Sequence, residues 1–570
     1  MQENKEMLHE TQSQTAEMTG KSVSERMPQE SNMSVVKEKT VTAETKRMRG
    51  QFNFFGPVTL VYAAFYAFCM FHNGSGITFP FFLAGTLLYF VFSLSKLEIT
   101  LKKGSIFYMI SMLLLGVSTF CTDGWAIIAL NKLAVFLLVM CLLLYQYFDT
   151  TKWNLGKYVG SICQLIVMSF GELNRPFIDG KAYFREKGKV NKKVWYGLLG
   201  AVIAIPILLI AAGLLSSADA VFRKMTTDFV NWIRPGNVFN VVFRIAFLFF
   251  ASYALTAYLC KRSIREEVRD HRNGEPVLAI TIMSLLSLLY LLFSGIQIFG
   301  LFLGKMQLPD GYTYAQYARE GFFQLLSVSI LNLILVLVCL SFFKESKVLK
   351  AVMTIMSLCT FVMIASSAMR MIIYIRYYYL TFLRIFVLWM LAVLFVMFIG
   401  VMISIYRESF PLFRYGVVAV TILYLVLSFS HPDYVIARVN IANAPGADGK
   451  GWTESEAQDY GNDFFDGSFF RGSEYSDYDY LCGLSADAAP AMIPYMESLG
   501  YDLSAYKLEY SIDIMDSTGW WSSYQQEGFG YYYLGHIKDG LDGLAHLSPR
   551  TFNVSRYMAL RQIEGRINEK

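Results

Sequence analysis

Charged residues, histidine and cysteine are all scarce in this chain, and each scarcity argues against a class of function. Only 17% of its 570 residues are charged and 55% are apolar, which is too apolar a composition for one soluble globular domain. The six His and eight Cys show no metal-ligand spacing and no CxxC pair, so we expect neither a metal site nor a disulfide framework. The sequence patterns of phosphate-binding loops, zinc proteases and serine hydrolases (GxxxxGK[ST], HExxH, GxSxG) are missing too. We therefore expect no cofactor, and nothing in the sequence supports an enzyme.

The net charge of +5 hides an uneven distribution along the chain. Residues 431–570 contain 21 Asp and Glu against 10 Lys and Arg, so the basic excess lies upstream. This is not the continuous basic surface that nucleic-acid binding requires. We therefore expect no nucleic-acid partner.

Long apolar runs are abundant between residues 51 and 430. Each run of about 20 residues, at about 1.5 Å per residue, can cross a hydrocarbon core of roughly 30 Å. The sequence predicts an all-α, multi-pass transmembrane bundle of about 11 spans, placed at residues 54–72, 77–95, 105–121, 126–147, 195–215, 237–260, 278–304, 321–343, 350–372, 382–405 and 412–430. Residues 1–50 hold too few large apolar groups to fold, and we predict a disordered cytoplasmic tail there.

Shorter patterns predict helices that do not span. Residues 153–173 and 216–236 are apolar but interrupted by polar groups, and we interpret both as helices at the membrane surface. Residues 431–570 are predicted to form a small, mainly helical domain. One helix runs from Ser485 to Gly500, and another follows Asn553.

The basic residues also predict the orientation. With the amino terminus inside, the inner connections and the span ends beside them carry 27 Lys and Arg, and the outer ones, counted with Arg370 and Arg384 at the adjoining span ends, carry 8. Positive charge is retained on the cytoplasmic side. We expect a membrane protein with a cytoplasmic amino terminus and an extracytoplasmic C-terminal domain.

Polar side chains inside the spans are costly in hydrocarbon and are candidate functional groups. They are Asn131, Lys132, Asn240, Arg244, Gln297 and Asn332. A transporter would gather such groups around a site in the middle of the membrane. Alternatively, the amides bond neighbouring helices, and Lys132 and Arg244 extend to the membrane surface.

A second set of polar residues is predicted at the outer membrane edge. It comprises Tyr314, Tyr317, Arg319, Glu320, Arg370, Arg376, Arg384, Asp433 and Arg438. Three arginines spaced by six and eight residues cannot form a voltage sensor, which needs one at every third position. The set could bind an anionic lipid headgroup or an acidic ligand through bidentate hydrogen bonds. The alternative is that carboxylates pair with the arginines and fasten the loops and the C-terminal domain to the bundle.

Five ordered motifs resemble a known family: LLSSADAVF (214–222), YTYAQYAREGFFQLL (312–326), RMIIYIRYYYLTFLR (370–384), HPDYVIARVNIAN (431–443) and DYDYLCGLSADAAPAM (477–492). Together they are similar to the bacterial integral membrane proteins of the domain of unknown function 4173 and the related family 4153. The family pattern has Gly before Leu-Thr in the third motif, where this chain has Tyr379. The resemblance implies a multi-pass plasma-membrane protein and no particular reaction.

Three functions remain open at this point. The first is a non-enzymatic envelope sensor or binding protein whose partners are membrane lipids or other anionic ligands at the outer face. The second is a transporter of small solutes or ions that uses the intramembrane polar residues. The third is a membrane-embedded enzyme that modifies lipids. A polar path through the membrane would favour transport, and a cavity open only to the outside would favour binding or lipid chemistry.

Overall fold

The computed structural model describes three main parts of the chain. They are residues 42–186 except 72 and 152, residues 235–443 except 267–271, 300–313 and 408, and, between 477 and 568, residues 477–498, 500, 533, 534, 537 and 549–568; residues 204, 208, 211, 215 and 219 are described singly. Most of the predicted tail and the predicted span 195–215 lie outside these residues. The last eight residues of the predicted tail form helix α2 (Ala43–Gly50), in which Met48 is buried.

Long apolar helices dominate the described chain and confirm the predicted fold class. They are α3 (Phe52–Met70), α4 (Thr78–Lys96), α5 (Ser105–Cys121), α6 (Trp125–Tyr147), α11 (Pro235–Cys260), α12 (Pro276–Gln297), α13 (Tyr314–Phe342), α14 (Lys347–Tyr378), α15 (Phe382–Tyr406) and α16 (Leu412–Phe429). Among the described residues, nine of these helices are long and apolar enough to cross a membrane, and α5 is slightly shorter. Ten predicted spans are thus matched by helices. The protein is a multi-pass helical membrane protein.

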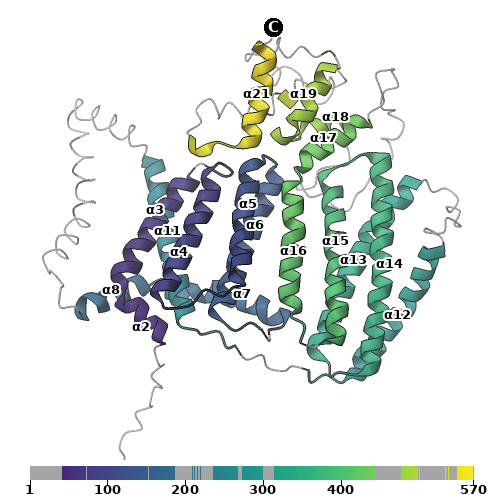
Figure 1. The fold of residues 1–570 in the computed structure, drawn as a ribbon, viewed down its shortest axis with the longest axis horizontal. Coiled ribbons are helices and arrows are strands. Elements are labelled where there is room, and N and C mark those ends of the chain that lie inside the picture. The colour runs from purple at the N-terminus through teal and green to yellow at the C-terminus, as the bar shows by residue number, and fades with distance from the viewer. Residues whose placement is uncertain are drawn as a thin grey trace, which may run out of the picture. The chain divides into compact units, whose positions relative to one another are not determined.

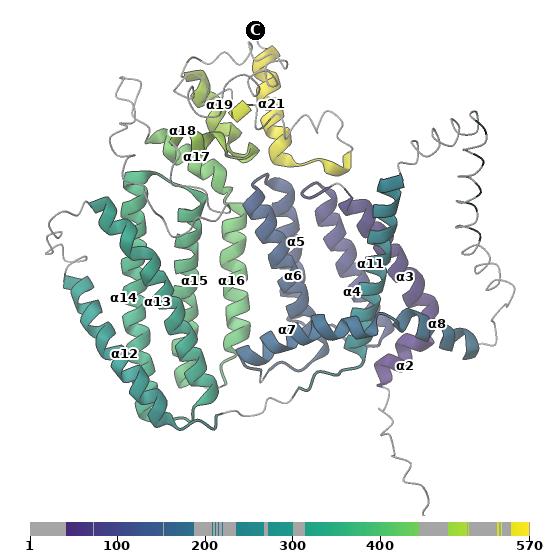
Figure 2. The same cartoon turned by 180° about the vertical axis from the view of Figure 1, so that it is seen from behind.

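The helices pack in two groups that α16 connects (Figure 1). Helices α3 to α6 pack in succession and α11 packs on α3, whereas α12 to α15 pack with one another, and α16 contacts both α5 and α15. The connections 97–104, 148–154, 261–266 and 343–346 lie at one end of the helices, which we call the basic end. The connections 73–77, 122–124, 379–381 and 430–431 lie at the other end, which we call the domain end because the C-terminal helices pack there (Figure 2).

Helix α7 (Leu155–Ser169) lies across the basic end, followed by η1 (Phe170–Glu172) and α8 (Arg175–Glu186) (Figure 2). The side chain of Asn154 caps the first turn of α7 by accepting a hydrogen bond from the Lys157 N–H at 2.8 Å. Leu165 is buried, whereas Val167 is exposed. The predicted helix at 153–173 is thus present and does not run with the spans, while its place at a membrane surface stays a prediction. The second predicted surface helix, at 216–236, lies almost wholly outside the described residues.

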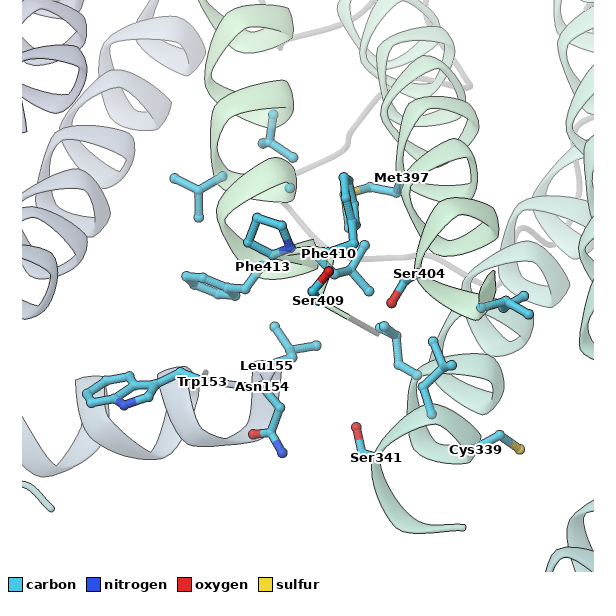
Figure 3. A pocket seen from close by; sticks show the side chains of 18 of the residues that line it. Trp153, Asn154, Leu155, Cys339, Ser341, Met397, Ser404, Ser409, Phe410 and Phe413 are labelled. Carbon is cyan, nitrogen blue, oxygen red and sulfur yellow. The ribbon is translucent and has the colours of Figure 1, made fainter. Parts of the chain in front are cut away.

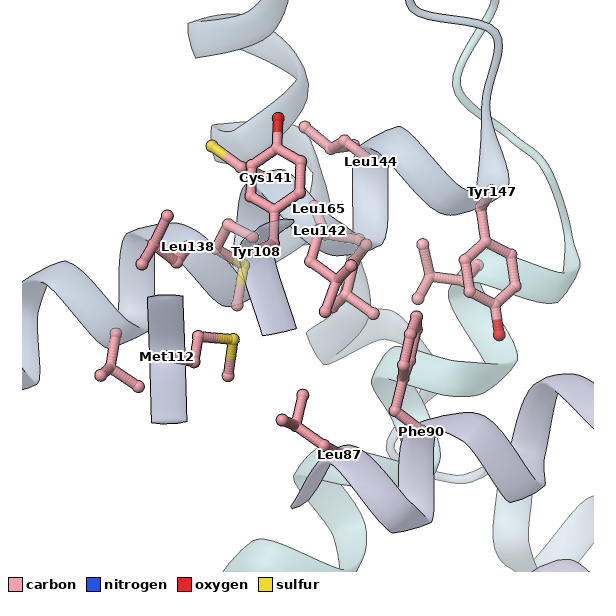
Figure 4. Packing of buried hydrophobic residues seen from close by; sticks show 14 of the residues in the cluster. Leu87, Phe90, Tyr108, Met112, Leu138, Cys141, Leu142, Leu144, Tyr147 and Leu165 are labelled. Atoms are coloured by element: carbon pink, nitrogen blue, oxygen red, sulfur yellow. The ribbon is translucent and has the colours of Figure 1, made fainter. Parts of the chain in front are cut away.

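The largest apolar cluster joins α4, α5, α6 and α7 (Figure 4). Leu87 of α4, Met112 of α5, Leu138 of α6 and Leu165 of α7 are all buried in it. In lipid such helices gain little from the hydrophobic effect, so close packing of these side chains holds the group together.

The C-terminal helices form a second, smaller core. They are α17 (Pro432–Ala442), α18 (Asp477–Cys482), η4 (Ala486–Ala488), α19 (Ala489–Ser498), η5 (Pro549–Thr551) and α21 (Val554–Asn568). Their core includes Leu380 from the connection between α14 and α15, so it is continuous with the bundle. Gly500 has φ +88° and Asn553 Oδ1 accepts a hydrogen bond from the Arg556 N–H at 3.2 Å. Both predicted helices in this region are confirmed, together with the residues that were predicted to end the first and start the second.

Candidate functional site

Polar groups from four separate segments meet where the C-terminal helices contact the domain end. We call Asp123, His431, Asp433, Asp487 and Arg556 the junction cluster. They come from the α5–α6 connection, the start of α17, η4 and the first turn of α21.

Asp487 is the acceptor at the centre of this cluster and is only 6% exposed. Its Oδ2 accepts a hydrogen bond from Thr122 Oγ1 at 2.5 Å, and its Oδ1 accepts one from the Asp123 N–H at 2.8 Å. His431 Nδ1 lies 3.3 Å from Asp487 Oδ2. One buried carboxylate thus joins η4 to the end of α5 and to the start of α17.

The other two carboxylates make further ties across the same junction. Asp433 Oδ2 accepts hydrogen bonds from Ser485 Oγ at 2.6 Å and from the Ser485 N–H at 3.2 Å. Arg556 Nε donates to Asp123 Oδ1 at 2.5 Å. Charge-assisted bonds of this kind are stronger than neutral ones. The cluster therefore fastens α17, η4 and α21 to the bundle.

The surroundings shift the pKa values of all four titratable members. The hydrogen bond to Asp487 raises the pKa of His431. Burial raises the pKa of Asp433 and of Asp123, although Arg556 opposes it at Asp123. Burial would also raise the pKa of Asp487, but hydrogen bonds from His431, Thr122 and the Asp123 N–H hold it below its ordinary value. Ionising all three carboxylates of the junction cluster at once is therefore electrostatically unfavourable.

The turn between α14 and α15 forms without the expected glycine. Tyr379 has φ 62° and ψ −177°, a region that favours glycine and is strained for other residues. The turn is held by Asn440 of α17, whose Oδ1 accepts from the Leu380 N–H at 2.8 Å and whose Nδ2 donates to the Leu380 carbonyl at 3.0 Å. Arg384 Nη1 also donates to the Tyr379 carbonyl. Residues of the third and fourth family motifs are thus bonded to each other.

Replacing Tyr379 by Gly is expected to raise stability by about 1 kcal/mol, because the strain at this backbone position is relieved. The measurement is the thermal unfolding midpoint of the purified protein in detergent. Tyr379→Ala is the control, since it removes the same ring and keeps a Cβ, and it should lower the midpoint. If Tyr379→Gly were no more stable than Tyr379→Ala, the backbone at this position would not be strained.

The structure distributes the predicted outer-edge residues over several environments. Arg370 is 7% exposed and is buried between helices, Arg376 is exposed, and the Arg384 guanidinium lies 4.4 Å from the centre of the Tyr374 ring. Asp433 bonds Ser485, as described above, and Arg438 Nη1 donates to Tyr434 Oη at 2.8 Å. The side chains of Tyr314, Tyr317, Arg319 and Glu320, in the first two turns of α13, lie outside the described residues. These contacts favour fastening for Asp433 and Arg384, while Arg376 and Arg438 are on the surface.

The intramembrane polar residues lie in two groups of helices. Asn131 Oδ1 accepts from Tyr424 Oη and Ser428 Oγ, each at 2.7 Å, and so joins α6 to α16. Gln297 Oε1 accepts from Ser366 Oγ at 2.7 Å, and Asn332 Nδ2 donates to Thr360 Oγ1 at 2.9 Å. These bonds tie neighbouring helices, as the structural alternative predicts.

Lys132 and Arg244 point toward the domain end, and Asn240 is exposed on α11. A Cβ added to Gly74, in the α3–α4 connection, would lie 3.3 Å from Lys132 Nζ. Arg244 Nη1 is 3.5 Å from the Met70 carbonyl at the end of α3. Both cations therefore extend toward a membrane surface.

The part of the chain that the structure describes contains no group of three or more His, Cys, Asp or Glu arranged to hold a metal ion. The carboxylates of the junction cluster are instead bonded to donors of the protein itself.

Sequence reasoning missed four of the five members of the junction cluster, Asp433 being the exception. His431 and Asp487 do fall within the quoted motifs, and Asp123 and Arg556 lie beside the start of predicted helices. The available signal was the position of acidic residues at helix starts on the same predicted side of the membrane.

Comparison with family models matches residues 109–495 to the model described as Domain of unknown function (DUF4153). This range contains all five quoted motifs and confirms the related family named from them, while the resemblance to the domain of unknown function 4173 stays a prediction. No curated protein and no solved structure matches the chain.

Proposed function

The chain belongs to the DUF4153 family, whose description assigns no activity. From the junction cluster we propose that the protein is a non-enzymatic envelope sensor. In this proposal the protonation of the cluster controls how tightly the C-terminal helices dock on the bundle. The observation that carries it is the meeting of three carboxylates and one imidazole, from three segments, at a single buried junction.

The orientation is part of the proposal. Inner connections and adjoining span ends with 27 Lys and Arg, against 8 on the outer side, support a cytoplasmic basic end in a bacterial plasma membrane. The domain end and the junction cluster then face the exterior, where the proton concentration varies with the surroundings.

The direction of the response follows from the pKa shifts. His431 has a raised pKa, so its stabilisation of the docked state is present below its ordinary pKa of 6.5 and is lost as the pH rises through the raised value. Asp433 and Asp123 also have raised pKa values, so their contribution to docking is fully present below the ordinary value of 3.8 and is lost as the pH rises through the raised values. Asp487 has a lowered pKa and loses its contribution only as the pH falls below 3.8. Mild acid should therefore tighten docking.

The remaining charged or titratable groups at the junction do not reverse this direction. These groups are two arginines, together with two tyrosines and one thiol, which ordinarily titrate above neutral pH. They are Arg556, Arg384, Tyr480, Tyr533 and Cys121.

The test is the pH dependence of hydrogen exchange in α21. After correction for the intrinsic effect of pH on exchange, the α21 amides should be severalfold better protected at about pH 6 than at about pH 8, because protonated His431 favours docking. His431→Gln, which keeps a polar side chain but cannot titrate, should remove most of this difference.

Amides of α4, remote from the junction, are the internal control and should show no such change. Equal corrected protection of α21 at both pH values would mean that the cluster only fastens the C-terminal helices, and it would refute the sensor proposal.

The exposed Arg376 and Arg438 remain proposed contacts for an anionic lipid or ligand at the same face. No described contact favours transport or lipid modification over this proposal.

A further inference from the structure

A large cavity lies between the two helix groups, at the basic end (Figure 3). Residues of α5, α6 and α7 line one side, residues of α13, α14 and α15 line the other, and α16 runs along it from Leu412 to Tyr424. Its volume is about 1010 Å³, which is at the upper end of the range of roughly 300 to 1,000 Å³ for ligand pockets. Its charged mouth lies at the end of the helices opposite the junction cluster, and the cavity does not depend on the proposed sensor function.

The depth of the cavity matches one leaflet of a bilayer. Along α16 its lining extends from Leu412 to Tyr424, and twelve residues of helix rise about 18 Å. Half of a hydrocarbon core is about 15 Å. The inner walls are mostly apolar and include Leu138, Met353 and Val420. An acyl chain entering from the basic end would therefore meet hydrocarbon-like walls along its length.

The mouth of the cavity is polar and carries an excess of positive charge. Arg272, Lys344 and Lys350 line it, together with the single carboxylate of Glu345. Arg272 Nη1 and Lys350 Nζ each lie 2.8 Å from a Glu345 oxygen, and Lys344 Nζ lies 3.3 Å from Glu275 Oε1. With Glu275 counted beside Lys344, three cations and two carboxylates leave a surplus of one positive charge at the mouth.

Hydroxyl and amide groups lie among these charges. Figure 3 shows Asn154 and Ser341 on opposite sides of the opening and Ser404 deeper in the cavity. Such groups can donate hydrogen bonds to phosphate oxygens, while Lys and Arg supply the charge. The cavity therefore has an apolar interior of leaflet depth and a cationic, donor-rich mouth.

We infer that this cavity binds one anionic glycerophospholipid, with its acyl chains along α16 and its phosphate group between Arg272, Lys344 and Lys350. A neutral lipid would leave the surplus charge at the mouth uncompensated. A soluble phosphate ester would leave the apolar interior empty.

The test measures lipid binding to the purified full-length protein in detergent by native mass spectrometry. The probes are phosphatidylglycerol, phosphatidylcholine and glycerol 1-phosphate. The wild-type protein should retain one phosphatidylglycerol in preference to phosphatidylcholine and should not bind glycerol 1-phosphate. The double variant Lys344→Gln/Lys350→Gln should bind phosphatidylglycerol about tenfold more weakly, because each surface cation contributes measurably to anionic lipid binding. Glu345→Gln should bind it more tightly.

Two further variants separate the cavity from the outer lipid annulus. Lys347→Gln is the matched control, because Lys347 is exposed in the same turn as Lys350 and is not part of the lining; its binding should stay within about twofold of wild type. Ala134→Phe places a ring in the apolar interior and should abolish retention of the lipid. If Ala134→Phe does not fold, the binding of phosphatidylglycerol by Lys344→Gln/Lys350→Gln, Glu345→Gln and Lys347→Gln tests the inference.

The inference is overturned if phosphatidylcholine is retained as well as phosphatidylglycerol, or if a folded Ala134→Phe protein retains the lipid. It is also overturned if Lys347→Gln weakens binding as much as the double variant. Competition by glycerol 1-phosphate equal to that of phosphatidylglycerol would show a surface phosphate site instead.

Discussion

Replacing Asp487 by Ala is expected to lower the free energy of unfolding by roughly 3 to 5 kcal/mol, because a buried charge network loses its central acceptor. The change leaves Thr122 Oγ1 and the Asp123 N–H without the acceptor they use at 2.5 and 2.8 Å, and it leaves His431 without its carboxylate. The measurements are the thermal unfolding midpoint in detergent and the hydrogen exchange of α21.

Two variants control for this result. Asp487→Asn keeps one acceptor oxygen and the side-chain volume, so it should cost less than Ala while removing the charge that raises the pKa of His431. Glu497→Ala removes another acid of the C-terminal helices, whose partner Arg566 lies 3.4 Å away in a partly exposed pair, and it should cost at most about 1 kcal/mol. If Asp487→Ala were no worse than Glu497→Ala, the junction cluster would not hold the C-terminal helices in place.

The spans could be predicted from the sequence because hydrocarbon thickness sets their length. Helix α5 has the predicted bounds, 105–121, and α15 differs from its prediction by one residue. Helix α14 instead runs from Lys347 to Tyr378 rather than from 350 to 372, because a helix can continue past the apolar run. α13 likewise begins at Tyr314 rather than at 321.

The extension of α13 explains why the sequence did not predict the buried position of Arg370. The apolar run suggested that Arg370 was at the edge of the membrane, where a headgroup could reach it. Because α13 begins almost two turns earlier, Gly321 lies inside the helix and packs against the Arg370 guanidinium. A buried position of this kind depends on the register between two helices, which hydropathy does not specify.

The junction cluster could not be predicted for a different reason. Thr122 and Asp487 are 365 residues apart, and no local spacing links them. By contrast, the extension of Lys132 toward a membrane surface could be predicted, because it depends only on the distance of Lys132 from the end of its own helix. Tyr379 lies between these cases: its motif marked a turn, but only the contacts from Asn440 and Arg384 show how a non-glycine residue is held there.

Replacing Arg370 by Ala is expected to cost about 2 to 5 kcal/mol, because it empties a buried site within α12, α13 and α14. Arg370 Nη2 lies 3.4 Å from Gln297 Oε1, and the same oxygen already accepts a bond from Ser366. A role limited to binding an external anion would predict a nearly intact fold instead. Arg370→Lys should recover little of the loss, because the planar guanidinium is what fits against Gly321.

Gly321→Ala supplies the decisive comparison, since a Cβ at this position would overlap the Arg370 guanidinium. In the wild-type background the change should cost about 1 to 3 kcal/mol through overpacking. In the Arg370→Ala background the space is free, so the same change should cost almost nothing, and the two variants should show a coupling energy of at least about 1 kcal/mol. The midpoints of thermal unfolding of the four proteins in one detergent give this value. Additive losses would mean that Arg370 and Gly321 are not packed together, and the fastening role of Arg370 would then have to be abandoned.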